Sequence, residues 1–237
     1  MLIDAGLTLR ETKLRLAQAG VRPEELSAIL ITHEHGDHIR GLGPVGRALK
    51  IPIYFTPETM KAARPWLGKG LKLCEFEPGS AFEVGDLRFE PFSTPHDAVD
   101  PVGFAFYCGR WKGALATDLG YATNLVIERL KGTNLLVLES NHDPAMLKDG
   151  PYPWPLKQRV AGKEGHLSNE DAGRLLAENL LHDGLSHVIL AHLSQVNNLP
   201  ELAYGKMRET LERESYGHVQ VGVALQDKTG AFAALGY

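Results

Sequence analysis

The chain has 237 residues, of which 43% are hydrophobic, and carries 25 Lys and Arg against 29 Asp and Glu, a formal net charge of −4 at pH 7. This size and composition suit one globular domain over residues 1–237. No apolar run is long enough to cross a bilayer, and no basic segment followed by an apolar core opens the chain, so we expect a cytoplasmic protein without membrane contact. Cys74 and Cys108 lie far apart and predict reduced core thiols.

Helices and strands alternate along the chain. Thr8 and Glu11 form a capping box, which opens a helix that ends near Gly20. Gly85 and Asp86 separate two alternating runs and predict a hairpin. A further helix is predicted after Gly43 and ends at Leu49. Others are predicted over 122–130, from Ser168 to beyond Leu180, and over 200–213. Strands are predicted over 28–31, 51–55, 81–84, 87–92, 102–108, 111–116, 135–138, 187–191, 220–225 and 231–234. This alternation predicts mixed sheets.

Residues 32–38 read Thr-His-Glu-His-Gly-Asp-His and follow the predicted buried strand 28–31. His33 and His35 are two apart on an extended segment, so their side chains point the same way and can bind one ion. Asp37 and His38 lie past the bend and can reach a second ion. Neutral imidazole with carboxylate suits zinc, and also manganese or iron.

Three further candidate ligands each follow a predicted strand, where a sheet presents its loops. They are His96, Asp118 and His192. Each residue alone is more typical of a cap or a turn than of a metal site. Together with the first cluster they supply seven ligands, enough for two divalent ions that share Asp118.

The histidine signature resembles that of the metallo-β-lactamase superfamily, in which His-x-His-x-Asp-His precedes a distant His, Asp and His. Within it the chain is similar to the YycJ (WalJ) group of bacterial exonucleases over nearly its whole length. The stretches that carry this likeness are residues 2–6, 139–143, 152–154, 165–172 and 191–198. Chains of that group begin with a strand or two before the Asp-Ala-Gly turn, whereas Met1 lies almost at the turn here. Either the start has been trimmed or the first sheet lacks an edge.

The resemblance implies an αββα sandwich, two sheets with helices outside, with two metals at one edge. Carried over to this sequence, the first ion takes His33, His35 and His96. The second ion takes Asp37, His38 and His192, and Asp118 bridges the two.

The resemblance also implies a two-metal phosphodiesterase that uses a metal-bound hydroxide, most similar to 5′-to-3′ DNA exonucleases linked to DNA repair. The leaving oxygen would receive a proton from Asp37 or from His166, which Glu139 would orient as in related transfer-RNA-processing nucleases. The alternative is that Glu139 and His166 only buttress the loop. Rival functions are a small-molecule hydrolase of thioesters or lactones, a ribonuclease, or a binding protein that keeps metal for structure.

An acidic protein needs a local basic patch to bind nucleic acid. The segment Lys148–Lys163 holds Lys157 and Arg159, with Trp154 available for stacking on bases. A Pro-rich loop leading into a solvated helix is the plainer interpretation. Past His192, three polar residues either contact phosphate and sugar or tie down the turn: Ser194, Asn197 and Asn198. The sequence leaves DNA versus RNA, metal identity and oligomeric state open.

Overall fold

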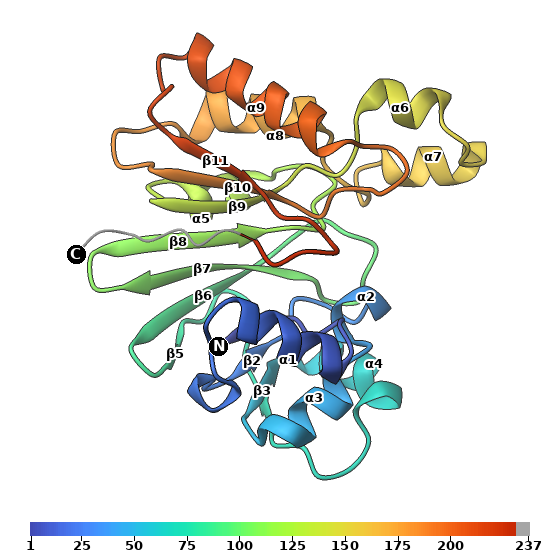
Figure 1. The fold of residues 1–237 in the computed structure, drawn as a ribbon, viewed down its shortest axis with the longest axis vertical. Coiled ribbons are helices and arrows are strands. Elements are labelled where there is room, and N and C mark those ends of the chain that lie inside the picture. The colour runs from blue at the N-terminus through green and yellow to red at the C-terminus, as the bar shows by residue number, and fades with distance from the viewer. Residues whose placement is uncertain (231–237) are drawn as a thin grey trace. The chain divides into compact units, whose positions relative to one another are not determined.

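The computed structural model describes residues 1–230 and divides the chain into two compact units. The first unit comprises residues 1–93 and 98–102, and the second begins with 94–97 and continues from 103. Each unit is a sheet with helices packed on it (Figure 1). The prediction that residues 1–237 form one domain stays a prediction.

The first unit contains a parallel sheet in the order β1-β2-β3-β4. Its strands are β1 (Leu2–Ile3), β2 (Ile29–Leu30), β3 (Ile53–Phe55) and β4 (Leu73–Glu75). Its helices are α1 (Leu9–Gln18), η1 (Pro23–Glu25), α2 (Gly36–Ile39), α3 (Leu42–Leu49) and α4 (Pro57–Leu67). The antiparallel hairpin β5 (Phe82–Val84) and β6 (Leu87–Ser93) belongs to the same unit.

The core of the first unit lies where helices meet one face of this sheet. Ile29 and Ile31, and likewise Ile53 and Phe55, are alternate residues, so their side chains share a face. They join the buried residues of α3 and α4, such as Val45, in one cluster. At the start of α1, Thr8 accepts a hydrogen bond from the amide of Glu11, as the capping motif predicts.

The second unit contains a sheet in the order β11-β10-β9-β8-β7. Its strands are β7 (Val102–Cys108), β8 (Trp111–Ala116), β9 (Leu135–Glu139), β10 (His187–Ala191) and β11 (Gln220–Val223). Its helices are α5 (Asn124–Leu130), α6 (Pro144–Asp149), α7 (Trp154–Val160), α8 (Asn169–Leu175), the π-helical turn η2 (Leu176–Leu180) and α9 (Pro200–Arg213). β8, β9 and β10 are parallel, so their carboxyl ends meet at one edge of the sheet.

Most predicted elements are confirmed within the described residues, including the hairpin at Gly85, the strands that become β7 and β8, and the helices that become α1, α3, α5, α8 and α9. The predictions omitted β1, β4, α2, α4 and α6, which are short or carry proline, whereas α7 is the helix that the plainer interpretation of the segment Lys148–Lys163 expected. The predicted strand 231–234 lies outside the described residues.

Cys74 and Cys108 are both free, but Cys108 ends β7 at the Gly109 turn and is exposed, so the expectation of a core thiol is wrong there. Across residues 1–230, the helices are all too short or too polar to span a bilayer.

Candidate active site

The histidine motif of the first unit occupies the turn from β2 into α2. His33 and His35 lie in the extended segment before the helix, while Asp37 and His38 lie in its first turn. The rings gather closely: the His33 centroid is 4.6 Å from that of His35 and 4.1 Å from that of His38. Nε2 of His38 is 3.6 Å from Oδ2 of Asp37. The structure therefore brings all four predicted residues of this unit into one cluster.

Asp4, directly after β1, fixes this cluster through hydrogen bonds to its carboxylate. Its Oδ2 accepts Nδ1–H of His38 at 2.7 Å and the hydroxyl of Thr32 at 2.8 Å, and its Oδ1 accepts the amide of Thr32 at 2.8 Å. Because the Thr32 hydroxyl donates to Asp4, its oxygen can accept Nδ1–H of His33 at 3.0 Å. Both imidazoles thus use Nδ1 internally and present Nε2, the pattern that carboxylates impose on metal-ligating histidines.

Sequence reasoning gave Asp4 no role, although it lies in the stretch 2–6. The same stretch needs Gly6, because a Cβ there would lie 1.5 Å from the carbonyl oxygen of Asp37. The turn after β1 therefore touches the metal-ligand candidates twice, through the Asp4 carboxylate and through the close approach of Gly6.

In the second unit, the other three predicted ligands meet at the carboxyl edge of the sheet. Asp118 follows β8, His192 follows β10, and His96 lies on the loop 94–97. Oδ1 of Asp118 is 3.5 Å from Nε2 of His96 and 3.6 Å from Nε2 of His192. Two ligands bound at about 2.05 Å to a tetrahedral ion are about 3.4 Å apart, so these spacings fit two metal bonds on either side of Asp118.

Asp118 and His192 have left-handed backbone, with φ of 55° and 58°, and Asp4 shares this conformation with φ of 62°. Side chains with a Cβ rarely adopt it, at a cost of about 1–2 kcal/mol per residue. Each of the three residues closely follows a strand of a parallel pair. The strained turn redirects the side chain at the strand end, and such strain concentrates at functional sites.

Glu139, the last residue of β9, organises the second-unit cluster. It is completely buried, and its Oε1 accepts Nδ1–H from both His166 and His192 at 2.8 Å. Its Oε2 accepts the backbone amides of Leu119 and Leu167 at 2.9 and 3.0 Å. The predicted pairing of Glu139 with His166 is thus present as a contact. The hydrogen bond to His192 was not foreseen, and it leaves Nε2 of that ring to face Asp118.

The electrostatics follow from these contacts. Burial raises the pKa of the Glu139 carboxyl, but hydrogen bonds from His166 and His192 outweigh it and hold that pKa below its usual range. Burial lowers the pKa of His166, yet the hydrogen bond and charge of Glu139 reverse this and raise it. For His96, burial prevails and lowers the pKa, although Asp118 opposes the shift. A neutral His96 is the form that binds a metal.

His96 is fixed in the same manner as the other histidines. Its Nδ1 lies 3.2 Å from the carbonyl oxygen of Gly165 and donates to it, so Nε2 carries the lone pair. In the first unit, His33 and His38 therefore present Nε2 with Nδ1 engaged, and Asp37 lies beside His38. In the second unit, His96 and His192 do the same beside Asp118. This donor set fits zinc, manganese or iron.

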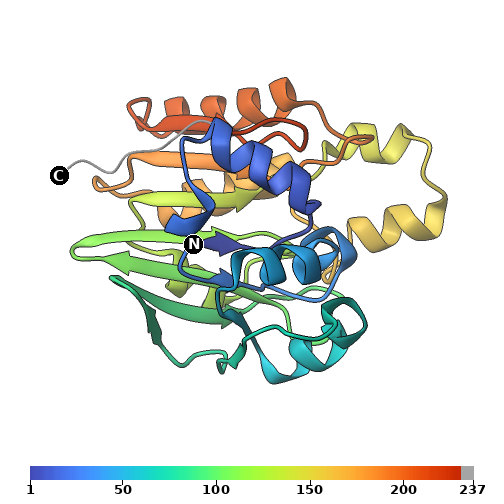
Figure 2. The same cartoon turned by 60° about the horizontal axis from the view of Figure 1, so that its bottom comes forward.

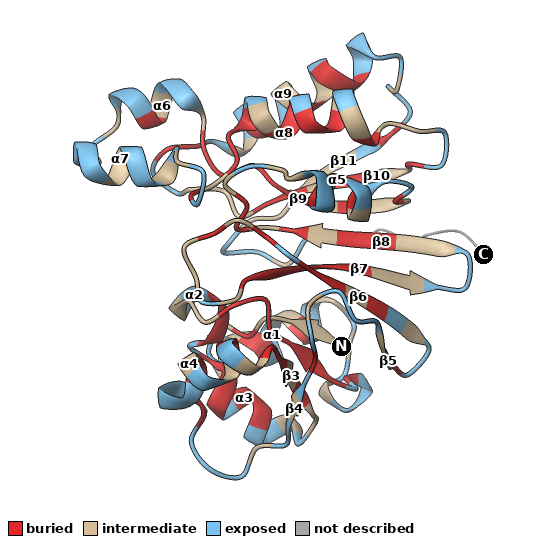
Figure 3. Ribbon diagram, turned by 180° about the vertical axis from the view of Figure 1, so that it is seen from behind, coloured by how far each residue is buried: buried red, intermediate tan, exposed pale blue. Residues whose placement is uncertain are grey.

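The predicted substrate residues Lys157 and Arg159 lie on α7. In Figure 2, α6 and α7 extend beyond the ends of the second-unit strands, and in Figure 3 they are largely pale blue. Trp154, at the start of α7, is 68% exposed. The ammonium of Lys157 donates to the carbonyl oxygen of Lys148 at 2.6 Å, which ties α7 to the end of α6. Arg159 instead forms an ion pair with Asp97.

Ser194, Asn197 and Asn198 form the turn between His192 and α9. Ser194 Oγ accepts the amide of Asn197 at 3.1 Å. The side-chain amide of Asn198 donates through Nδ2 to the carbonyl oxygens of Ser140 and Asn141 and to Asn169 Oδ1 at 2.9–3.0 Å. Asn197 is fully buried and Asn198 nearly so. These bonds support the alternative in which the three residues hold the turn in place. Substrate contact by either asparagine would require this buried network to open.

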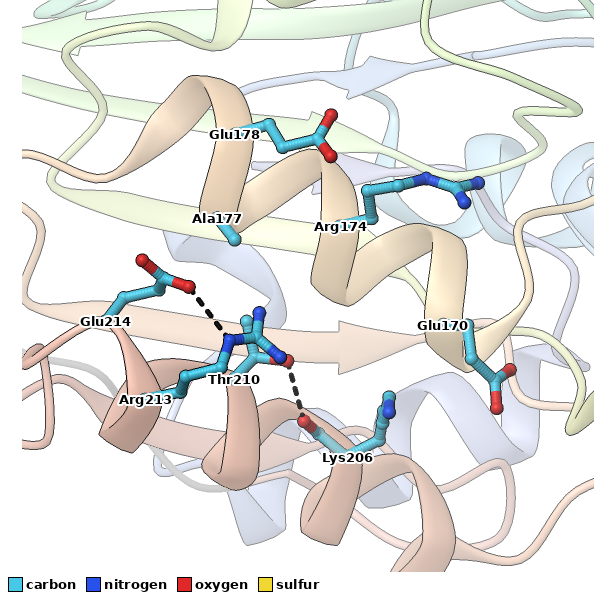
Figure 4. Close-up of a pocket in the computed structure, with 8 residues that line it drawn as sticks. All are labelled: Glu170, Arg174, Ala177, Glu178, Lys206, Thr210, Arg213 and Glu214. Carbon is cyan, nitrogen blue, oxygen red and sulfur yellow. Dashed lines mark hydrogen bonds and ion pairs between the residues drawn. The ribbon is translucent and has the colours of Figure 1, made fainter.

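A separate groove lies between α8, η2 and α9 (Figure 4). Its charged residues carry both signs, and several are already paired, as Arg213 is with Glu214 at 2.9 Å. Metal-ligand spacing is not seen among them, since the described candidate clusters of this kind lie elsewhere. We therefore assign the chemistry to the strand ends.

Imidazoles held through Nδ1 at strand ends, beside the carboxylates of Asp37 and Asp118, are the donor set of a metal-dependent hydrolase. A model described as the β-lactamase superfamily domain matches residues 1–193. The chain belongs to this superfamily. Exodeoxyribonuclease YycJ of Bacillus anthracis is 39% identical over 220 residues, covering 92% of this chain and 83% of that protein. Exodeoxyribonuclease WalJ of Streptococcus pneumoniae is 36% identical over 221 residues, covering 92% and 82%.

Solved structures agree on the fold. The metallo-β-lactamase fold protein YhfI from Bacillus subtilis superposes with a TM-score of 0.71 at 21% identity, covering 97% of this chain and 85% of that one. Zn(2+)-bound PqqB from Methylobacterium extorquens gives 0.70 at 18% identity, covering 99% and 83%. The predicted family, the mixed α/β fold class with two sheets, and the assignment as a hydrolase are confirmed.

Proposed function

We propose that this chain is a two-metal phosphodiesterase that degrades DNA, as a 5′-to-3′ exonuclease serving DNA repair in the cytoplasm. The observation that carries the proposal is the set of histidines fixed through Nδ1, with Nε2 held beside Asp37 and Asp118 at 3.5–3.6 Å. The relatives that cover 92% of the chain are named exodeoxyribonucleases, which supports DNA as the substrate class.

The proposed ligands follow the family pattern. One ion takes His33, His35 and His96. The other takes Asp37, His38 and His192, with Asp118 between them. Zinc, manganese and iron all suit imidazole with carboxylate, so the metal has to be identified by measurement.

When bound, two such ions activate water and stabilise charge on a phosphate. The chain itself must protonate the leaving oxygen. His166 suits this role because Glu139 holds its Nδ1 and raises its pKa, which keeps a proton available at Nε2. Asp37 is the alternative donor, and it is the more exposed of the two residues.

The helices α6 and α7 supply the proposed path for the DNA strand. Lys148 and Lys157 provide positive charge near Trp154, whose exposed ring can stack on an unpaired base. A chain with a net charge of −4 attracts DNA only through such a local group. Binding should therefore weaken steeply as salt is added.

The test is to incubate the purified protein with DNA and RNA labelled at the 5′ or 3′ end, with manganese or zinc added. We expect metal-dependent release of nucleotides from the 5′ end of DNA, and its loss in Asp118→Ala. Preference for RNA would favour the ribonuclease alternative. Cleavage of a thioester or lactone without cleavage of either nucleic acid would favour the small-molecule hydrolase. Equal cleavage by Asp118→Ala would place the activity elsewhere.

A further inference from the structure

The segment 118–121 carries an exposed aromatic ring out of the second-unit cluster. Asp118 is almost completely buried, whereas Tyr121, three residues further on, is 45% exposed. Within residues 1–230, the Tyr121 ring stacks on no other ring, and its hydroxyl has no hydrogen-bond partner. Three residues span at most about 11 Å, so the ring stays within reach of a molecule bound at Asp118.

The backbone between these two residues is fixed on three sides. The amide of Leu119 donates to Oε2 of Glu139 at 2.9 Å. The amide of Gly120 donates to the carbonyl oxygen of Pro95 at 3.0 Å. Gly120 also packs tightly on the chain that follows α7, because a Cβ there would lie 2.1 Å from the carbonyl oxygen of Lys163. The ring that follows is therefore presented from a rigid turn, which also positions the proposed bridging ligand.

A second exposed ring lies farther from the cluster. Trp154 begins α7, and the residues that follow this helix return to pack on Gly120. In Figure 2 the connection between α6 and α7 lies farthest from the strand ends. The seven residues of α7 rise by about 10 Å, roughly the length of three stacked bases at about 3.4 Å each. Trp154 therefore suits a base farther along the strand, and the base nearest the cluster is left to Tyr121.

We propose that Tyr121 is a substrate-binding residue that stacks on the base of the terminal nucleotide, beside the phosphodiester that is cleaved. This contact presupposes the proposed function and adds a base contact to that same site. A flat ring stacks on any base, because every base has a π-face, and this tolerance suits an enzyme that removes nucleotides in any order. Tyrosine also loses little conformational freedom on stacking, since its side chain has only two torsions to fix.

The test is a double-mutant cycle between the ring and the base. Tyr121→Ala and Tyr121→Phe are compared with the wild-type chain on DNA whose 5′-terminal nucleotide either carries a base or is abasic. We expect Tyr121→Ala to lower kcat/KM for release of the first nucleotide by about 5–150-fold, the range for one lost base stack. Tyr121→Phe should retain nearly all activity, because it keeps the ring. On the abasic end, Tyr121→Ala should cleave about as fast as the wild type.

Tyr204→Ala is the matched control. Tyr204 is 44% exposed, nearly the same as Tyr121, but lies on α9, which packs against α8 and β11. This variant should match the wild type on both substrates. Removing the Tyr121 ring should also leave the salt dependence of kcat/KM unchanged, because stacking neutralises no phosphate, whereas Lys157→Gln should lower it.

Equal kcat/KM in the wild type and Tyr121→Ala overturns the contact, and so does an equal loss on base-bearing and abasic ends. A loss that disappears only when an internal nucleotide is abasic overturns the assignment to the terminal base. Circular dichroism checks folding, and Tyr121→Leu, which keeps an apolar side chain without a π-face, replaces Tyr121→Ala if that variant does not fold. A wild-type chain that cleaves no nucleic acid overturns the proposed function itself, so the two failures are distinguishable.

Discussion

Replacing Glu139 with glutamine tests the centre of the second-unit cluster. The carboxylate accepts four hydrogen bonds, two from imidazoles and two from backbone amides. A glutamine has one acceptor oxygen, so its NH₂ group must face one of these two pairs of donors. If the NH₂ group faced the amides of Leu119 and Leu167, these two buried donors would lose their acceptor, at a cost in stability of about 1–3 kcal/mol each. We therefore expect the NH₂ group to face the rings.

The rings can adapt by moving their protons from Nδ1 to Nε2, and this places a proton where His192 would bind metal. Glu139→Gln should therefore keep its fold while its metal affinity falls by about 10–100-fold. DNA cleavage should fall by about 10²–10⁴-fold, because His166 loses the anion that orients it and keeps it charged.

The assay measures metal affinity by chelator competition and cleavage of end-labelled DNA at saturating metal, with urea unfolding in chelator as the stability check. Glu170→Gln, an exposed change on α8, is the matched control. Wild-type metal affinity together with a wild-type cleavage rate in Glu139→Gln would refute the role of this carboxylate. A loss of metal-free stability above about 3 kcal/mol would instead show that the backbone amides lose their acceptor.

Four further substitutions probe other parts of the molecule. Asp4→Asn tolerates the left-handed backbone, but its NH₂ group must face either the Thr32 amide or the pair formed by His38 Nδ1–H and the Thr32 hydroxyl, so metal content should fall toward one ion per chain by elemental analysis, whereas unchanged content would contradict the role of Asp4. Lys157→Gln should weaken DNA binding and lower the salt dependence of log K by about 0.7–0.9 on a titration, and an unchanged slope would exclude a phosphate contact. Gly205→Ala has open space inside α9 and should stabilise the chain by about 0.5–1 kcal/mol in urea unfolding, while Gly6→Ala should destabilise it because of the Asp37 carbonyl; equal effects would refute the close approach.

Local patterns identified the parts of this fold that local physics controls. Thr8 caps α1, the Gly85 turn closes its hairpin, and the His-rich motif follows a buried strand, as the residue types predict. The short helices were harder to see. α4 begins at Pro57 and contains Pro65, and α6 begins at Pro144, and both were missed. Proline in a first helical turn is compatible with a helix, and this signal was available.

The supporting residues of the site depend on contacts that no local pattern encodes. Asp4 and His38 are 34 positions apart, and Glu139 and His192 are 53 apart. In the sequence, a lone carboxylate after a short strand is as typical of a turn as of a residue that supports a site. Only the pairing of parallel strands, which aligns their ends, shows which carboxylate meets which imidazole. The polar turn after His192 illustrates the reverse case, because Asn197 and Asn198 look accessible in sequence and are buried.

The left-handed turns at Asp4, Asp118 and His192 set stability against activity. Glycine would relax such a backbone, so a variant such as Asp118→Gly removes a ligand and also removes about 1–2 kcal/mol of conformational cost. In chelator, we expect its melting temperature to equal or exceed that of the parent. Selection for heat tolerance without metal would then favour inactive chains, and directed evolution of this enzyme needs metal present at every round.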